Sequence, residues 1–195
     1  MSVKGEDYED FICGQRGGSV LQNRRPCGCG GLPACGAGGP GADVAVVLPL
    51  YQKVKEKFSD QLHFECYDYV DLAWRHSYCG LFSMERDGVT WYFLDNEQYF
   101  RRPELYGYMD DGERFGFFSR AVVRMLPHLR FWPEVIHCND WQTALVPIYL
   151  KDDGVREERF RSIRTVLSIH NIEYQAATAA RPWGTCSAWT TAGRM

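Results

Sequence analysis

The sequence predicts an α/β domain in which a parallel sheet is flanked by helices. Short apolar runs, rich in β-branched and aromatic residues, alternate with stretches of helical periodicity between residues 42 and 175. This order of strands and helices is typical of a sheet with crossover connections, which binds ligands at the carboxyl ends of its strands. A chain of 195 residues with 45% hydrophobic residues can bury the core of one such domain.

Five apolar runs of strand length are the predicted strands. They comprise residues 44–48, 64–72, 89–94, 135–137 and 165–169. Between the third and fourth runs, over residues 110–128, apolar residues recur at spacings of three and four behind a capping Asp110 or Asp111. This spacing predicts an amphipathic helix that lies across the sheet.

A second helix is expected directly after the fourth strand. It is predicted to run from Trp141 to Leu150. Asp140 would supply its N-cap, and Gly154 follows just beyond its end. Pro147 lies inside this span and is expected to kink or shorten the helix.

Three segments of the chain differ in composition. Residues 1–41 form an aberrant segment rich in glycine and cysteine, and residues 14–41 of it are predicted to be coil because they lack a periodic apolar pattern. Residues 42–175 hold the predicted domain. Residues 176–195 lose the pattern again and form an aberrant tail.

Charge and cysteine content exclude several classes of function. A net charge of -3 without a basic run argues against a nucleic-acid partner. The acidic start is unlike a secretory signal and no long apolar run is present, so we expect a cytoplasmic protein without a membrane partner. Cys27, Cys29 and Cys35 have no fourth ligand at the spacing that zinc needs, so neither a metal nor a cofactor is expected.

Polar side chains end two consecutive predicted strands. Asp140 follows His137 and Asn139 at the end of one strand, and His170 ends the next. Because parallel strands would bring Asp140 and His170 close together, this pattern favours a functional site. The alternatives are that Asp140 caps a helix while Trp141 packs in the core, and that His170 is a structural histidine.

A polar loop rich in aromatic residues follows the third strand, over residues 95–108. Its tyrosines and arginines suit stacking and hydrogen bonding to sugar rings; they are Tyr99, Arg101, Arg102, Tyr106 and Tyr108. The alternative is an ordinary aromatic loop that packs on its own domain.

The middle segment contains an ordered series of motifs: Ala42–Tyr51, Tyr92–Asn96, Gly112–Arg120, Val135–Gln142 and Ser168–Gln175. Together these motifs resemble the bacterial glycogen (starch) synthase family of the ADP-glucose type, over about residues 42–175. The resemblance implies a Rossmann-like domain, the N-terminal half of a two-domain, GT-B type glycosyltransferase. This chain is expected to be that first domain only.

The resemblance also implies a reaction and a set of site residues. Family members transfer glucose from ADP-glucose, with retention, to the non-reducing 4-hydroxyl of an α-1,4-glucan such as glycogen. Asp140 and His170 match catalytic residues around the transferred sugar, in the His-x-x-Asp-Trp and His-Asn stretches. Tyr106, Asn171 and Tyr99 match substrate contacts. Most of the nucleotide site is expected on the second domain.

The chain departs from the family pattern at both ends. Members open with a strand and a Lys-Thr-Gly-Gly-Leu loop that meets the donor phosphates, and this reading frame contains no such loop. A shift by one base across the codons of residues 8–40 permits that strand and loop, and the opposite shift across residues 176–195 permits a family-like continuation. We therefore hypothesise that both ends are read out of frame, which would leave Val44–Leu48 without a neighbouring strand and the fragment inactive.

Two other interpretations of the chain's function are compatible with the sequence. The chain could be a non-catalytic glucan-binding remnant that keeps an acceptor surface around Tyr99–Tyr108, or a pseudogene product that does not fold. A retaining synthase that uses another nucleotide is also compatible with the motifs, because base selection belongs to the second domain.

Overall fold

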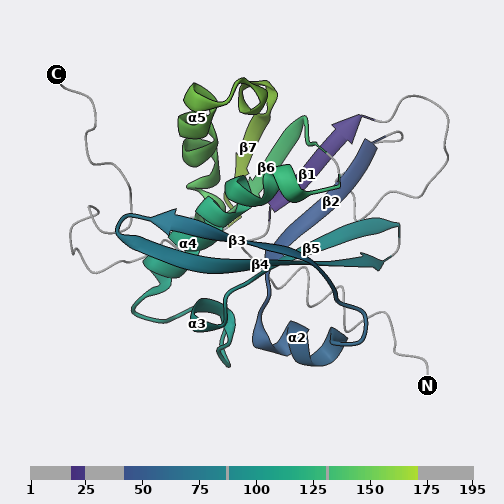
Figure 1. Cartoon of the computed structure of the whole chain (residues 1–195), viewed down its shortest axis with the longest axis vertical. Helices are drawn as coiled ribbons and strands as arrows, with labels where there is room; N and C mark the ends of the chain where they lie inside the picture. Colours follow the sequence, from purple (N-terminus) through teal and green to yellow (C-terminus); the bar gives the residue numbers. More distant parts are fainter. Residues whose placement is uncertain (1–18, 25–41, 87, 131, 171–195) are drawn as a thin grey trace.

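A seven-stranded sheet organises the part of the chain that the structure, a computed structural model, describes: residues 19–24, 42–86, 88–130 and 132–170. The strand order is β3-β4-β5-β2-β1-β6-β7 (Figure 1). The strands are β1 (Ser19–Arg24), β2 (Ala42–Pro49), β3 (His63–Leu72), β4 (Arg75–Arg86), β5 (Val89–Asp95), β6 (Val135–Asn139) and β7 (Arg164–Ser168). All five predicted strands are present, and the α/β class is confirmed.

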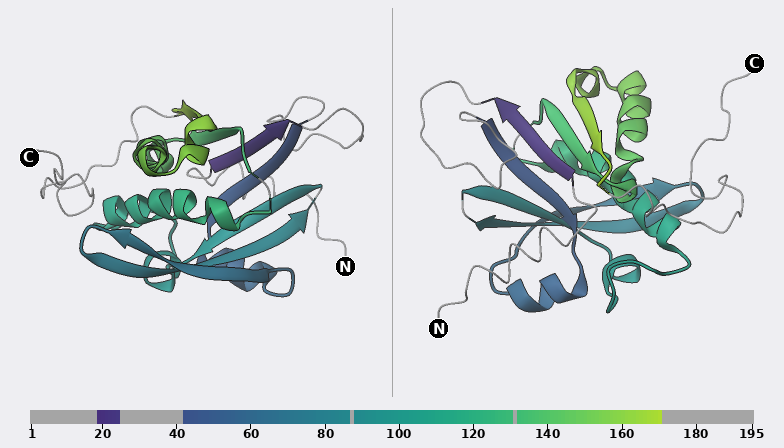
Figure 2. Two further views of the ribbon diagram at one scale, coloured as in Figure 1. Left: turned by 45° about the horizontal axis from the view of Figure 1, so that its top comes forward. Right: turned by 180° about the vertical axis from the view of Figure 1, so that it is seen from behind.

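The helices among the described residues lie on both faces of this sheet. They are α2 (Gln52–Phe58), α3 (Glu97–Phe100), α4 (Asp111–Met125) and α5 (Val146–Arg156), with 3₁₀ turns at Leu126–His128, Trp141–Thr143 and Glu158–Ser162. One face of α4 packs on the β3–β4 hairpin and another packs against α5, while α2 and α3 lie on the opposite side of the hairpin strands (Figure 2). No helix in the described ranges is long and apolar enough to span a bilayer.

Parallel and antiparallel pairings are combined in the sheet. The predicted parallel pairing is confirmed for β2 with β5 and for β6 with β7, but the prediction of a parallel sheet is wrong for β1, β3 and β4, which pair antiparallel with their neighbours. β4 was not predicted, and it pairs antiparallel with both β3 and β5. Its sequence hides a strand because polar residues and a glycine interrupt the apolar alternation, and the hairpin turn contains Ala73 at φ 54° instead of glycine or asparagine.

β1 corrects two expectations about the N-terminal segment. Residues 19–24 were predicted to be coil, but they form a strand between β2 and β6, antiparallel to both. Val44–Leu48 therefore has a neighbour on each side, contrary to the expectation of an unpaired edge. Backbone hydrogen bonding, which any non-proline residue can supply, fills the slot where apolar periodicity gave no sign of a strand.

The two predicted helices differ in how well their bounds agree with the structure. The first is confirmed as α4 with the 3₁₀ turn that extends it to His128. The second is wrong in its start and its end: a 3₁₀ turn covers Trp141–Thr143, and α5 begins only at Val146. Pro147 lies in the first turn of α5, where its missing N–H costs no hydrogen bond, and Gly154 lies inside the helix.

Candidate active site at the carboxyl edge of the sheet

The carboxyl ends of four strands share one edge of the sheet. β1 is antiparallel to both β2 and β6, so β2, β5, β6 and β7 all run in the same direction. Polar residues end β5 and β6 and follow β7 at this edge. Ligands of open α/β sheets bind at such an edge, which makes it the first place to look for a site.

Asp140 and His170 meet at this edge, as the sequence predicted. The backbone N–H of His170 donates to Oδ1 of Asp140 over 2.7 Å, and the backbone N–H of Asp140 donates to the carbonyl of Ser168 over 2.8 Å. The ring Nε2 of His170 lies 3.1 Å from Oδ1 of Asn139. These contacts tie the end of β6 to the end of β7 and orient the exposed imidazole.

Asp140 has an unusual backbone conformation and a buried side chain. Its backbone has φ 58° and ψ -174°, a conformation that L-residues other than glycine rarely adopt. The side chain is only 4% exposed, and its Oδ2 has no hydrogen-bond partner among the described residues. A buried, unpaired carboxylate oxygen on a strained residue is costly, so this oxygen is available to accept a hydrogen bond from a ligand hydroxyl.

Neighbouring backbone contacts hold this strained turn in place. The Thr143 hydroxyl donates to the carbonyl of Asn139 over 2.8 Å, and the Thr143 N–H donates to the carbonyl of Asp140 over 3.3 Å. On the other strand, the Ser168 hydroxyl lies 2.7 Å from Nε2 of His137. The two Thr143 contacts thus fix the turn, and the contact between Ser168 and His137 joins β7 to β6 beside it.

The alternative roles of Asp140 and Trp141 have different outcomes. The Asp140 carboxylate makes no capping hydrogen bond to the turn that follows, so a side-chain cap does not explain this residue. Trp141 is partly buried against the core and meets Phe115 edge to face, with ring centroids 5.0 Å apart. Trp141 therefore has the packing role that was left open for it.

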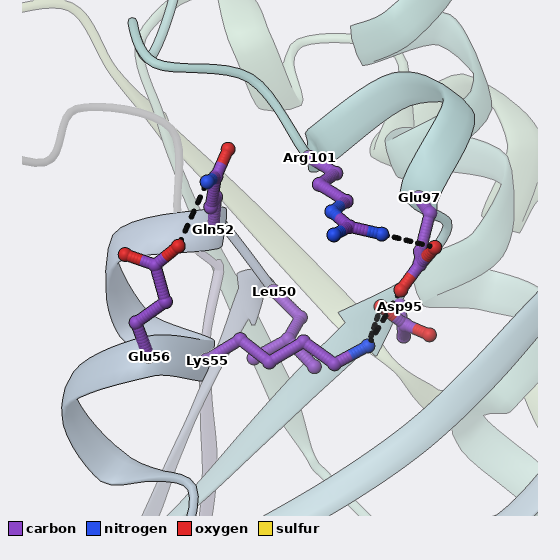
Figure 3. A pocket seen from close by; sticks show the side chains of 7 residues that line it. All are labelled: Leu50, Gln52, Lys55, Glu56, Asp95, Glu97 and Arg101. Atoms are coloured by element: carbon purple, nitrogen blue, oxygen red, sulfur yellow. Dashed lines mark hydrogen bonds and ion pairs between the residues drawn. The ribbon is translucent and has the colours of Figure 1, made fainter.

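A pocket of about 160 Å³ opens where β2 and β5 end (Figure 3). Lys55, on α2, reaches across it to two carboxylates: its Nζ lies 3.5 Å from Asp95 and 3.1 Å from Glu97. Arg101 also pairs with Glu97, over 3.2 Å. The remaining lining residues are Leu50, Gln52 and Glu56. This cluster was not predicted from the sequence, although a lysine one turn into a helix that follows a strand was the available signal.

Burial and charge act in opposite directions in this pocket. Burial raises the pKa of Asp95 above its ordinary value, while the Lys55 cation counteracts the shift. Glu97 is exposed, and its hydrogen bond to Lys55 lowers its pKa. The pocket thus contains two cations, Lys55 and Arg101, that pair with two of its three carboxylates, Asp95 and Glu97.

The aromatic loop is mainly a packed structure. Tyr99 is 2% exposed and its hydroxyl donates to Glu113 over 2.6 Å, which leaves it no free surface for a substrate. Arg102 forms a double hydrogen bond to Asp110, at 2.7 and 2.5 Å. These contacts favour the alternative of a loop packed on its own domain for Tyr99 and Arg102.

Two further predicted substrate contacts have different placements. Tyr106 is 37% exposed in the segment between α3 and α4, so its side chain is accessible from solvent. Asn171 lies outside the described residues. Within the described ranges no group of three or more histidine, cysteine or acidic side chains is arranged to hold a metal ion.

Comparisons with known proteins agree with the motifs. Residues 29–189 match the model of the starch synthase catalytic domain. A glycogen synthase of Lactococcus lactis is 53% identical over 133 residues, which are 68% of this chain and 28% of that protein. A glycogen synthase of Lactobacillus acidophilus is 44% identical over 141 residues, 72% of this chain and 30% of the relative. The chain thus spans less than a third of the length of these relatives.

A solved structure is also similar. It is the catalytic domain of starch synthase IV from Arabidopsis thaliana bound to ADP and acarbose. The TM-score is 0.57 at 28% identity, and the match covers 66% of this chain and 27% of that one. The shared part is therefore one segment of a much longer catalytic unit.

Proposed function

The chain belongs to the starch synthase catalytic-domain family, and from that premise we propose that it carries the N-terminal, acceptor-side part of an ADP-glucose-dependent α-1,4-glucan synthase. The donor would be ADP-glucose, the acceptor a glycogen-type glucan, and the product a new α-1,4 bond with retained configuration. The chain alone is expected to transfer almost no glucose, because it covers 28% of its Lactococcus relative.

The unpartnered carboxylate oxygen of Asp140 is the observation on which this proposal rests. Its Oδ2 is buried, has no partner among the described residues and lies at a carboxyl edge where a sugar can approach. During the transfer, the bond between the anomeric carbon and the ADP oxygen breaks while positive charge develops on the glucose ring. A fixed carboxylate that accepts a hydrogen bond from a glucose hydroxyl positions the sugar ring. It also stabilises the developing positive charge without having to move.

His170 is proposed to act beside Asp140 as a second group around the transferred glucose. Its exposed ring is oriented by Asn139, and its backbone N–H is bound to the same carboxylate that would hold the sugar. Tyr106 and Asn171 are proposed as further substrate contacts. The acarbose and ADP named for the Arabidopsis relative are compatible with such a sugar-nucleotide site.

A graft into a complete relative tests this function. Residues 42–170 of this chain would replace the matching segment of the Lactococcus glycogen synthase, and transfer of labelled glucose from ADP-glucose to glycogen would be measured. We expect the graft to be active and the Asp140→Asn graft to lose at least about 100-fold in kcat. Asp152→Asn, at an exposed carboxylate on α5, is the matched control and should leave kcat unchanged.

Two results of the graft experiment would contradict the proposal. If the Asp140→Asn graft retains the kcat of the unsubstituted graft, Asp140 does not serve the transferred sugar. An inactive but folded graft, as judged by its circular dichroism and thermal unfolding, would show that residues 42–170 cannot serve as the synthase domain.

The proposal includes the two terminal segments. Residues 1–41 and 176–195 are proposed to be read out of frame, while residues 42–175 carry the domain. The direction of β1, opposite to that of both of its neighbours, supports this, whereas the family match over residues 29–189 extends past the proposed bounds at both ends. Base-level sequencing of the gene around codons 40–42 and 175 tests it, and an intact present frame would refute it.

A further inference from the structure

Arg114, in the first turns of α4, is a fully buried cation. Its side chain is 0% exposed, although arginine is almost never fully buried unless it is paired. Apolar side chains that fill the same space are often as stable as a buried ion pair, or more so. Packing alone therefore does not explain a charge at this position, and its hydrogen-bond partners have to be considered.

The partners of Arg114 lie at the end of α3 and in the segment that leads from α3 to α4 (Figure 1). Nε donates to the Tyr99 carbonyl over 2.7 Å, and Nη2 donates to the Leu105 carbonyl over 3.3 Å. Nη1 donates to Oδ1 of Asp111, the first residue of α4. One guanidinium thus joins α4 to two points of the chain that precedes it.

Asp111 directs its other carboxylate oxygen back to the same segment. Oδ2 accepts the backbone N–H of Gly107 over 2.5 Å and that of Tyr108 over 3.1 Å. The Asp111 side chain is 13% exposed, so water competes little for these hydrogen bonds. Asp111 and Arg114 therefore act as one unit, here called the Asp111–Arg114 pair, that binds the segment through both of its members.

Tyr106 lies between the two residues that the pair holds. Leu105 is bound through its carbonyl by Arg114, and Gly107 is bound through its N–H by Asp111. Gly107 has φ 102°, a conformation that is strained for any residue with a side chain. The backbone on both sides of Tyr106 is thus fixed, while its side chain is 37% exposed at the surface.

Tyr108 strengthens the same attachment. The guanidinium of Arg114 lies 4.9 Å from the centroid of the Tyr108 ring, and that of Arg102 lies 4.8 Å from it. The Tyr108 hydroxyl accepts the backbone N–H of Glu104 over 3.0 Å. The turn around Tyr106 is therefore ordered by contacts that do not involve the Tyr106 ring.

We propose that the Asp111–Arg114 pair positions Tyr106 for contact with the sugar substrate. The segment follows the carboxyl end of β5 by way of α3, and β5 runs in the same direction as β6, which ends at Asp140. A side chain that is held in place before the substrate arrives contributes more to the reaction than a mobile one. The inference rests on the proposed function for the role of Tyr106, and Asp111 and Arg114 are positioning residues that act through it.

Hydrogen exchange of the 195-residue chain tests whether the pair holds the segment. The amide of asparagine has a single acceptor oxygen, so in Asp111→Asn it cannot serve both Arg114 and the backbone N–H groups. We expect the N–H groups of Gly107 and Tyr108 to exchange at least about ten-fold faster in Asp111→Asn than in the parent chain. Asp152→Asn, at an exposed carboxylate on α5, is the control. Equal exchange in Asp111→Asn and the parent would overturn the proposal.

A double-mutant cycle in the graft into the Lactococcus synthase tests the link to Tyr106. We expect Asp111→Asn to lower kcat/KM for glucose transfer about ten-fold when Tyr106 is present, and less than about two-fold in a Tyr106→Ala graft. The reason is that the pair acts on the substrate only through Tyr106. A merely structural role would give the same loss in both grafts, and that result, or no loss in either, would overturn the proposal.

Gly107→Ala disturbs the same turn without changing the ion pair. The added Cβ meets no atom within 4 Å, so the substitution acts only through backbone strain. Gly88→Ala, between β4 and β5, is the matched control because Gly88 has φ 75° and equally open space around its Cβ position. We expect kcat/KM of the graft to fall about three- to ten-fold in Gly107→Ala and to stay unchanged in Gly88→Ala. Equal values in the two variants would contradict the positioning role.

The same graft separates this inference from the proposed function. An inactive graft, or one that keeps its kcat in Asp140→Asn, contradicts the proposed function and removes the basis of the inference. An active graft that depends on Asp140 but shows no coupling between Asp111 and Tyr106 contradicts the inference alone.

Discussion

The two halves of the carboxyl edge differ in how their buried carboxylates are paired. Where β2 and β5 end, Lys55 pairs with Asp95 and Glu97, and Arg101 pairs with Glu97. Where β6 ends, Asp140 is strained and buried, with one carboxylate oxygen unpartnered among the described residues. The first arrangement stabilises the fold, whereas the second leaves a carboxylate oxygen that a ligand hydroxyl could satisfy, at a cost in stability.

This difference helps to separate structural from functional charges. Carboxylates at strand ends look alike in the sequence, since Asp95-Asn96 and Asn139-Asp140 both follow apolar runs. The distinguishing feature is the partner: Asp95 has a cation from another element, whereas within the described ranges the Asp140 carboxylate has a backbone N–H and no cation. Substitutions in the two halves should therefore affect stability and activity in opposite proportions.

Removal of the Lys55 cation should have the largest effect on stability. Lys55→Met leaves the Asp95 carboxylate, whose side chain is 9% exposed, without its ion pair. Because Lys55 itself is 40% exposed and solvent screens the pair, we expect a loss of about 1–2 kcal/mol in the free energy of unfolding. Urea denaturation of the 195-residue chain measures it, and Lys53→Met on the exposed side of α2 is the control.

Asp140→Asn should affect stability less, despite the deeper burial of Asp140. The amide oxygen can still accept the His170 N–H, and no cation is left unpaired. We expect a change below about 1 kcal/mol in urea denaturation, in contrast to the large loss of transfer in the graft. A destabilisation larger than that of Lys55→Met would break the distinction between the two halves.

The pH dependence of Asp95 provides the finest test. Burial raises its folded pKa above the ordinary 3.8, so its contribution to stability is full below the unfolded pKa and is lost as pH rises through the folded pKa. Since Lys55 opposes this shift, Lys55→Met should raise the pKa further and extend that window upward. Carbon-13 NMR titration of the carboxyl group checks it; an unmoved pKa would mean that Lys55 does not act on Asp95.

The elements of this fold that show a local sequence pattern could be predicted from the sequence. Apolar runs predicted β2, β3, β5, β6 and β7, and spacing predicted α4, because burial on one face imposes a period on the residues. The pairing of Asp140 with His170 followed from the shared edge of parallel strands. The residues that bring them together, and the unpartnered oxygen of Asp140, depend on tertiary contacts with no local sequence signal.

The elements that were not predicted, β1, β4 and the Lys55 cluster, also depend on tertiary contacts. β4 carries polar residues on both of its faces, and β1 is held by backbone pairing with β2 and β6, so neither shows a period of its own. Lys55 was overlooked because its partners are on β5 and α3, not on its own helix. Where contacts between distant segments determine a structure, a single segment of sequence carries too little information to predict it.

The position of β1 has a consequence for the order of folding. Within the sheet, β1 is the element that joins β2 to β6, and the residues it pairs with come from near both ends of the described chain. Closing such a long loop is entropically slow, whereas β3, β4 and β5 pair with their neighbours in sequence. We therefore expect the hairpin half to form early, and the β6–β7 half, with Asp140 and His170, to be assembled late in the folding reaction.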